Sequence, residues 1–168
     1  ITALMDRVAR TAPFHRELAK LGTEEQAVFD HTSLPGVPFV AALCIRTIPD
    51  TARAWVIAPH LRAQESLAAQ LETWGVRNIL FVPEKEVALG EEVGDPELAA
   101  ERLNVLHRIA SGHVGRQTVV LTEGSLNDEV PSPDGMQNQG MTLKTGETHA
   151  PDDLIRLFAV SYTHLRAH

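Results

Sequence analysis

The sequence has only one cysteine, Cys44, among its 168 residues. A single thiol cannot form a disulfide within the chain, which is consistent with a reducing compartment and excludes a small disulfide-stabilised domain. No apolar run approaches the roughly 20 residues of a membrane-spanning helix, and no signal peptide opens the chain, so we expect no membrane contact. With 43% apolar and 22% charged residues, the composition is that of a globular domain rather than a disordered chain.

Positive charge is also scarce. The chain has 15 basic and 22 acidic side chains, a net charge of −7. Residues 1–83 have 8 of each sign, whereas residues 84–159 have 6 basic and 14 acidic side chains. Proteins that bind duplex DNA depend on contacts of Lys and Arg side chains with the phosphates. We therefore do not expect this chain itself to bind a nucleic acid backbone.

The apolar pattern predicts an α/β fold. The runs 54–58, 79–82 and 118–122 have the length and composition of strands that are buried on both faces. Helical spacing follows the first two runs, and a buried helix over 39–48 precedes them. Such strand–helix–strand units build a mostly parallel sheet with helices on both sides, which predicts three layers. The run 27–29 is a further, short strand candidate.

The same pattern divides the chain into parts. Residues 1–24 are expected to form a helical segment with two short helices, and residues 25–138 the α/β domain. An alternating run at Met141–Lys144 and a helix from Pro151 predict the truncated start of a second small α/β domain over 139–159. Residues 160–168 resemble translated sequencing adapter, so we expect a non-native tail, and the initial Ile1 suggests a longer natural reading frame.

The turn before the 39–48 helix is where a phosphate-binding loop would lie. A P-loop needs several glycines to expose N–H groups, a lysine for the β- and γ-phosphates and a hydroxyl for magnesium. Residues 31–39 read HTSLPGVPF, with one glycine, Gly36, two prolines and no lysine. We therefore predict a degenerate loop and no cofactor-binding residue in this chain.

No catalytic or metal-ligating residue is predicted either. His107 and His113 lack a second pair of ligands at metal-site spacing. Cys44 lies in an apolar run and is expected to be a buried, inert thiol. Ser125 follows a strand, but an asparagine replaces the second glycine of a nucleophile elbow. The acidic residues of 84–97 are expected to be a solvated connector and helix start rather than a magnesium site.

One residue pair, Glu101-Arg102, leaves two interpretations open. Arg102 is either a helix-surface residue that pairs with a neighbouring acid or part of a family signature. Taken in order, the motifs over about residues 25–159 resemble the N-terminal, UvrB-like region of the bacterial transcription-repair coupling factors, the Mfd family. The motifs are Trp55–Pro59, Phe81–Glu86, Asp95-Pro96, Glu101–Leu103 with Leu106, Val119–Thr122, Pro131–Pro133 and Leu143–Glu147.

The resemblance implies a UvrB-like, RecA-like domain that has lost its nucleotide loop, followed by the start of a UvrB interaction-type domain. Members of the family are large cytoplasmic DNA translocases of the helicase superfamily. They hydrolyse ATP with magnesium, displace stalled RNA polymerase on duplex DNA and recruit UvrA for nucleotide excision repair. The motor would lie downstream, so this segment is expected to be a non-catalytic adaptor, and its partner-binding residues stay unassigned.

Two other interpretations stay open. The strand–helix pattern alone also suits a stand-alone α/β enzyme or nucleotide-binding domain. A degenerate domain of another DNA-repair helicase is the third interpretation. The downstream reading frame would discriminate among the three, because only a coupling factor combines a polymerase-binding domain with a motor that has an intact P-loop.

Overall fold

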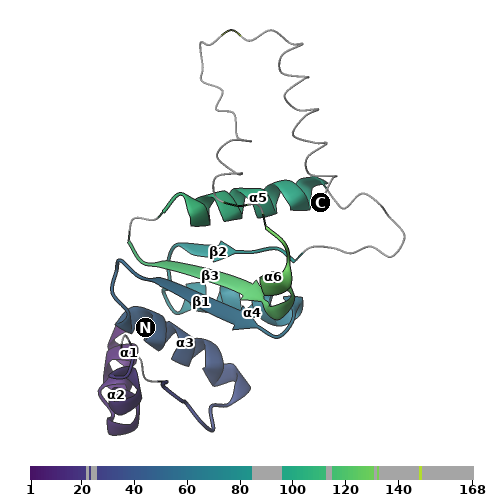
Figure 1. The fold of residues 1–168 in the computed structure, drawn as a ribbon. Coiled ribbons are helices and arrows are strands. Elements are labelled where there is room, and N and C mark those ends of the chain that lie inside the picture. The colour runs from purple at the N-terminus through teal and green to yellow at the C-terminus, as the bar shows by residue number, and fades with distance from the viewer. Residues whose placement is uncertain are drawn as a thin grey trace. The chain divides into compact units, whose positions relative to one another are not determined.

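The computed structural model describes residues 1–21, 23, 26–84, 96–112, 115–130, 132 and 148. The chain divides into two units, residues 1–129 and residues 130–168. All helices and strands among the described residues lie in the first unit (Figure 1). The predicted second domain over 139–159 and the predicted tail over 160–168 lie outside the described residues, apart from residue 148.

Three parallel strands form the sheet, in the order β1-β3-β2. They are β1 (Arg53–Ala58), β2 (Ile79–Phe81) and β3 (Gln117–Thr122). All six residues of β3 are buried, as its continuous apolar run predicted for a central strand. The predicted α/β fold with a parallel sheet is therefore confirmed, although the sheet is small.

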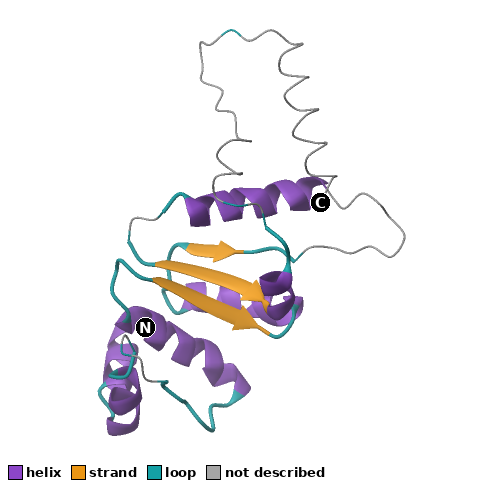
Figure 2. Cartoon of the chain, viewed as in Figure 1, coloured by secondary structure: helices purple, strands orange, loops and turns teal. Residues whose placement is uncertain are grey.

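Helices cover both faces of the sheet (Figure 2). On one face, α3 (Val37–Thr47) and α4 (Leu61–Thr73) pack around Val120 of β3. On the other, α5 (Pro96–Ala110) packs around Val119 of the same strand. Neighbouring residues of a strand point to opposite faces, so these two valines, both 0% exposed, mark the two halves of the core. The predicted three layers are confirmed.

The prediction that β1 is buried on both faces is wrong. Trp55 and Ile57 are 51% and 54% exposed, while Val56 between them packs into the core beside α3 and α4. The reason is the position of α5, whose apolar residues Val105 and Ile109 pack with Leu80 of β2 and with β3. α5 contacts β1 only at its start among the described residues, where Arg53 Nη2 donates to Ile109 O at 2.8 Å, so Trp55 and Ile57 stay half exposed.

The strand predicted at residues 27–29 is also wrong, because no strand forms there. Phe29 instead packs its ring against Phe14, with the ring centroids 5.6 Å apart. Phe14 belongs to α2 (Ala12–Leu18), which follows α1 (Thr2–Ala9), so the two short N-terminal helices are confirmed. The side chain of Phe29 thus contacts α2 rather than contributing to the sheet.

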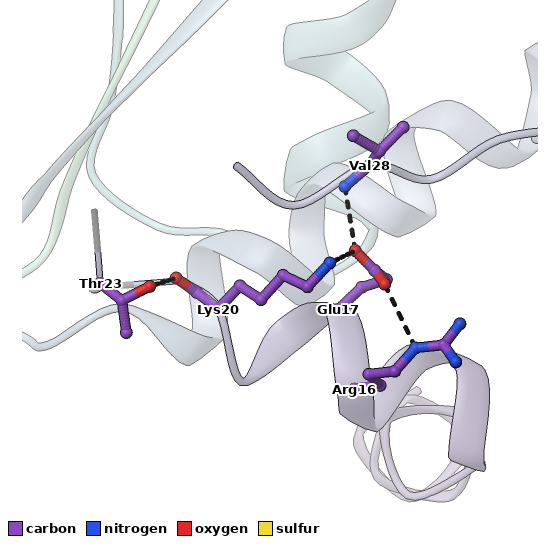
Figure 3. Close-up of polar contacts among 5 residues, drawn as sticks. All are labelled: Arg16, Glu17, Lys20, Thr23 and Val28. Atoms are coloured by element: carbon purple, nitrogen blue, oxygen red, sulfur yellow. Dashed lines mark hydrogen bonds and ion pairs between the residues drawn. The ribbon is translucent and has the colours of Figure 1, made fainter. Parts of the chain in front are cut away.

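A carboxylate joins α2 to the segment that follows it (Figure 3). Glu17 accepts hydrogen bonds from Lys20 Nζ at 2.8 Å, from the backbone N–H of Val28 at 3.1 Å and from Arg16 Nε at 3.4 Å. The hydrogen bond from Lys20 and then that from Val28 hold the pKa of Glu17 below its ordinary value. These contacts fix the course of the chain between α2 and the turn at residues 31–36.

Candidate functional site at the carboxyl end of the sheet

The carboxyl ends of the parallel strands are where open α/β sheets bind their ligands. Here β1, β2 and β3 end at Ala58, Phe81 and Thr122. Residues 82–84 follow β2, and the short helix α6 (Glu123–Asn127) follows β3 directly. The side chains that meet at this end therefore define the candidate site.

A buried glutamine holds two of the strand ends together. Gln64 of α4 is 0% exposed, and its Nε2 donates to the carbonyl oxygens of Val82 at 2.8 Å and Val120 at 2.9 Å. The Oε1 atom of Gln64 has no hydrogen-bond partner among the described residues. Sequence analysis missed this residue, although Gln64 shares the inward stripe of α4 with Leu67 and Leu71, three and seven positions later.

Arg102 of α5 makes the second connection. Its Nη1 donates to the carbonyl oxygen of Pro83 at 2.6 Å, and its Nη2 lies 3.0 Å from Oδ2 of Asp128. The two side chains are only 12% and 22% exposed. Arg102 thus pairs with an acid, as one interpretation held, but its side chain is mostly buried rather than on the helix surface, and it links α5 to the end of β2 and to the residue after α6.

Ser125, which the sequence analysis did not assign as a nucleophile, lies in the first turn of α6. Ser125 is 6% exposed, and its N–H donates to Thr122 Oγ1 at 3.1 Å. The two hydroxyl oxygens are also 3.1 Å apart, so both hydroxyls are engaged in capping the helix. A Cβ added to Gly124 would meet the carboxylate of Glu84, which therefore lies directly against this turn.

The turn before α3 uses two of its backbone N–H groups in local hydrogen bonds. Residues Leu34–Gly36 form a single turn of 3₁₀ helix, η1. The N–H of Gly36 donates to Ser33 O at 2.8 Å, and that of Val37 donates to Leu34 O. Pro35 has no N–H group to offer. The N–H groups of Gly36 and Val37 are thus used within the turn, and Pro35 offers none, whereas a P-loop directs consecutive N–H groups to a phosphate.

The other candidate residues lie apart from this site. His107 is exposed on α5, whereas His113 and residues 85–95 of the acidic connector are outside the described residues. Cys44 is partly buried in α3, and burial raises the pKa of its thiol, which keeps the thiol protonated near neutral pH. Within the described part of the chain, no three His, Cys, Asp or Glu side chains gather closely enough to hold a metal ion.

The described helices include none that is both long and apolar enough to cross a bilayer. Comparison with protein-family models, with curated proteins and with solved structures gave no match to the chain. The site must therefore be interpreted from its own geometry. The described residues build a junction of β2, β3, α4 and α5 here, in which Gln64 and Arg102 bond to the backbone of the strand ends and Arg102 pairs with Asp128.

Proposed function

We propose that this chain is the N-terminal adaptor region of a bacterial transcription-repair coupling factor. In this proposal its α/β unit is a UvrB-like, RecA-like domain that has lost nucleotide binding, and it acts without catalysis. The ATP- and magnesium-dependent motor that moves on duplex DNA and displaces stalled RNA polymerase is a separate part of the same cytoplasmic protein. The adaptor contributes to the recruitment of UvrA.

The observation that carries the proposal is the meeting of motif residues at the carboxyl end of the sheet. Pro83 and Arg102 belong to two separate motifs on which the family resemblance rests, and the side chain of Arg102 binds the carbonyl of Pro83 directly. The contact gives a physical reason for an arginine at position 102, because its guanidinium joins α5 to the backbone at the end of β2.

The turn at residues 31–36 supports the same proposal. Its N–H groups at Gly36 and Val37 are used within the turn, and it has no lysine. A working nucleotide-binding domain needs free N–H groups and a lysine at this position, both to bind the phosphates. The turn therefore favours an α/β domain that does not bind a nucleotide.

Calorimetric titration with ATP and magnesium tests the loss of nucleotide binding. We expect no saturable heat from this chain at millimolar ATP, whereas UvrB, whose loop should be intact, provides the positive control. Binding of ATP to this chain with a micromolar dissociation constant would refute the adaptor function and favour a stand-alone nucleotide-binding domain.

Recruitment of UvrA needs its own experiment. The chain joined to its natural downstream sequence, so that the second domain is complete, is immobilised and exposed to UvrA. We expect UvrA to be retained and excess UvrB to displace it, because the proposal gives both proteins a similar UvrA-binding module. Failure to retain UvrA under these conditions would refute the recruitment function.

A further inference from the structure

A cleft beside the N-terminal helices is the feature that the proposed function leaves unused. Three elements line it: α1 with the residue that follows, α2 with the residue that follows, and the end of α3. Its volume of about 330 Å³ is at the lower end of the range for small-molecule sites. The residues that line it are different from those of the junction at the carboxyl end of the sheet, so the cleft is a separate candidate site.

Hydrogen bonds fix the turn between α1 and α2. Only Arg10 and Thr11 separate the two helices. The N–H and the hydroxyl of Thr11 donate to Val8 O at 3.0 Å and 2.7 Å, and the N–H of His15 donates to Thr11 O at 2.8 Å. The backbone from which Arg10 enters the cleft lining is therefore held in place by its neighbours.

An ion pair joins the α1 side of the cleft to the end of α3. Nη2 of Arg46 lies 3.0 Å from Oδ1 of Asp6, which lines the cleft. Nη1 of Arg46 donates to Sδ of the buried Met5 at 3.3 Å, and Thr47, the next residue, is the contribution of α3 to the lining. The negative charge of Asp6 thus has its partner within the protein.

Positive charge is in excess on the two N-terminal helices. Residues 1–20 have 4 basic and 2 acidic side chains, and the second acidic residue, Glu17, does not line the cleft. Its carboxylate instead accepts from Lys20 Nζ and from the N–H of Val28 (Figure 3). Neither carboxylate of these helices therefore lacks a partner of its own.

Two nitrogen-bearing side chains of the lining are left with their donors unused. Arg10 and His15 are both exposed at the cleft. Within the described part of the chain, no hydrogen bond or ion pair engages either side chain. A guanidinium has five N–H donors in a planar fork, and this geometry matches a carboxylate, which it binds through two parallel hydrogen bonds.

The rest of the lining is mainly apolar. Ala9, Leu18 and Ala19 contribute it, and Leu18, which is 5% exposed, also belongs to the hydrophobic core. Small-molecule sites typically combine such an apolar surface with a few polar groups that fix the orientation of the ligand. The cleft therefore suits a ligand with one anionic group and a short apolar body.

We propose that the cleft between α1, α2 and the end of α3 binds a small organic monocarboxylate. The carboxylate lies against Arg10 and His15, and the apolar body lies on Ala9 and Leu18. A phosphate dianion suits the cleft less well, because Asp6 is 48% exposed and places a like charge in the same lining. The cleft is open and has one free arginine, so we expect a dissociation constant on the order of 1 mM for a ligand of about ten non-hydrogen atoms.

Nuclear magnetic resonance of the ¹⁵N-labelled full chain, titrated with sodium benzoate to about 50 mM at constant ionic strength, tests the proposal. We expect saturable shifts of the amide signals of Ala9, Arg10 and Ala19. Benzylammonium, which has the ring but the opposite charge, and acetate, which has the charge but no ring, should each bind at least about tenfold more weakly. Absence of a saturable shift with benzoate, or equal affinity for benzylammonium, would overturn the proposal.

Two variants locate the ligand. Arg10→Gln should weaken benzoate binding by about tenfold, whereas Arg7→Gln, at an exposed arginine of α1 that does not line the cleft, should change it by less than about twofold. Equal losses in both variants would show a general attraction of anions to these helices and refute the site. Ala19 has ordinary helical angles, with φ −65° and ψ −20°, so Ala19→Leu fits the backbone and fills the cleft. Benzoate that still binds Ala19→Leu with the parent affinity would place the ligand elsewhere and refute the proposal.

Discussion

Replacement of Arg102 by alanine tests the junction at the carboxyl end of the sheet. The change removes a charge-assisted hydrogen bond to Pro83 O and the ion pair with Asp128. Losing one partner of a fully buried pair costs about 3–5 kcal/mol, because the other charge stays desolvated. Asp128 is still 22% exposed and is partly rehydrated, so we expect Arg102→Ala to lower the free energy of unfolding by about 2–3 kcal/mol.

Urea unfolding of the whole chain measures this loss. With a slope of about 1–3 kcal/mol per molar urea, a loss of about 2–3 kcal/mol should lower the midpoint by roughly 0.7–3 M. Arg108→Ala provides the matched control, because Arg108 lies exposed on the same helix, and its loss should change the free energy of unfolding by less than about 0.5 kcal/mol.

A double-mutant cycle with Asp128→Asn separates the ion pair from the packing of the arginine. Two groups in direct contact should show a coupling energy of about 1 kcal/mol or more. Equal stability of Arg102→Ala and Arg108→Ala, or full additivity of the Arg102→Ala and Asp128→Asn effects, would refute the structural role assigned to this contact.

Three further outcomes are expected. Gln64→Leu should lower the free energy of unfolding by about 1–3 kcal/mol, because Val82 O loses its buried donor, whereas Gln70→Leu on the same helix should be nearly neutral; equal effects would contradict the cross-link. The folded-state pKa of Glu17 lies below the ordinary 4.5, so its carboxylate stabilises the fold above about pH 4.5 and loses this effect as the pH falls through the folded-state value. The difference in free energy of unfolding between the parent chain and Glu17→Gln should therefore shrink between about pH 7 and pH 3. Cys44 should react with a thiol reagent about tenfold more slowly at pH 7.5 than in the urea-unfolded chain, because burial raises its pKa and limits access; equal rates would show an accessible thiolate.

The elements that the sequence predicted well are those with a local cause. The apolar run of β3 is long enough to be recognised as a buried central strand, and Gly75 ends the helix before β2 with a positive φ of 85°. These features depend on neighbouring residues alone. The predicted positions of the main helices and strands are therefore confirmed to within a few residues.

The features that the sequence did not predict depend on where distant elements meet. The exposure of Trp55 results from the placement of α5 over the other two strands, which the pattern of β1 cannot encode. The acid that pairs with Arg102 is Asp128, which lies far along the chain, and the sequence alone did not identify which acid this would be. Gln64 is a polar residue at a buried position. The carbonyl groups that its side chain binds come from the ends of β2 and β3, so its burial is explained only by how these strands are arranged around it.

The strand order has a consequence for synthesis on the ribosome. Of the three described strands, β3 is the last to be made, and both others hydrogen-bond to it and not to each other. A nascent chain that has not yet released residues 117–122 therefore cannot form either of these two ladders, even though β1 and β2 have emerged. The apolar residues of β1 and β2 reach their places in this sheet only after β3 has been synthesised.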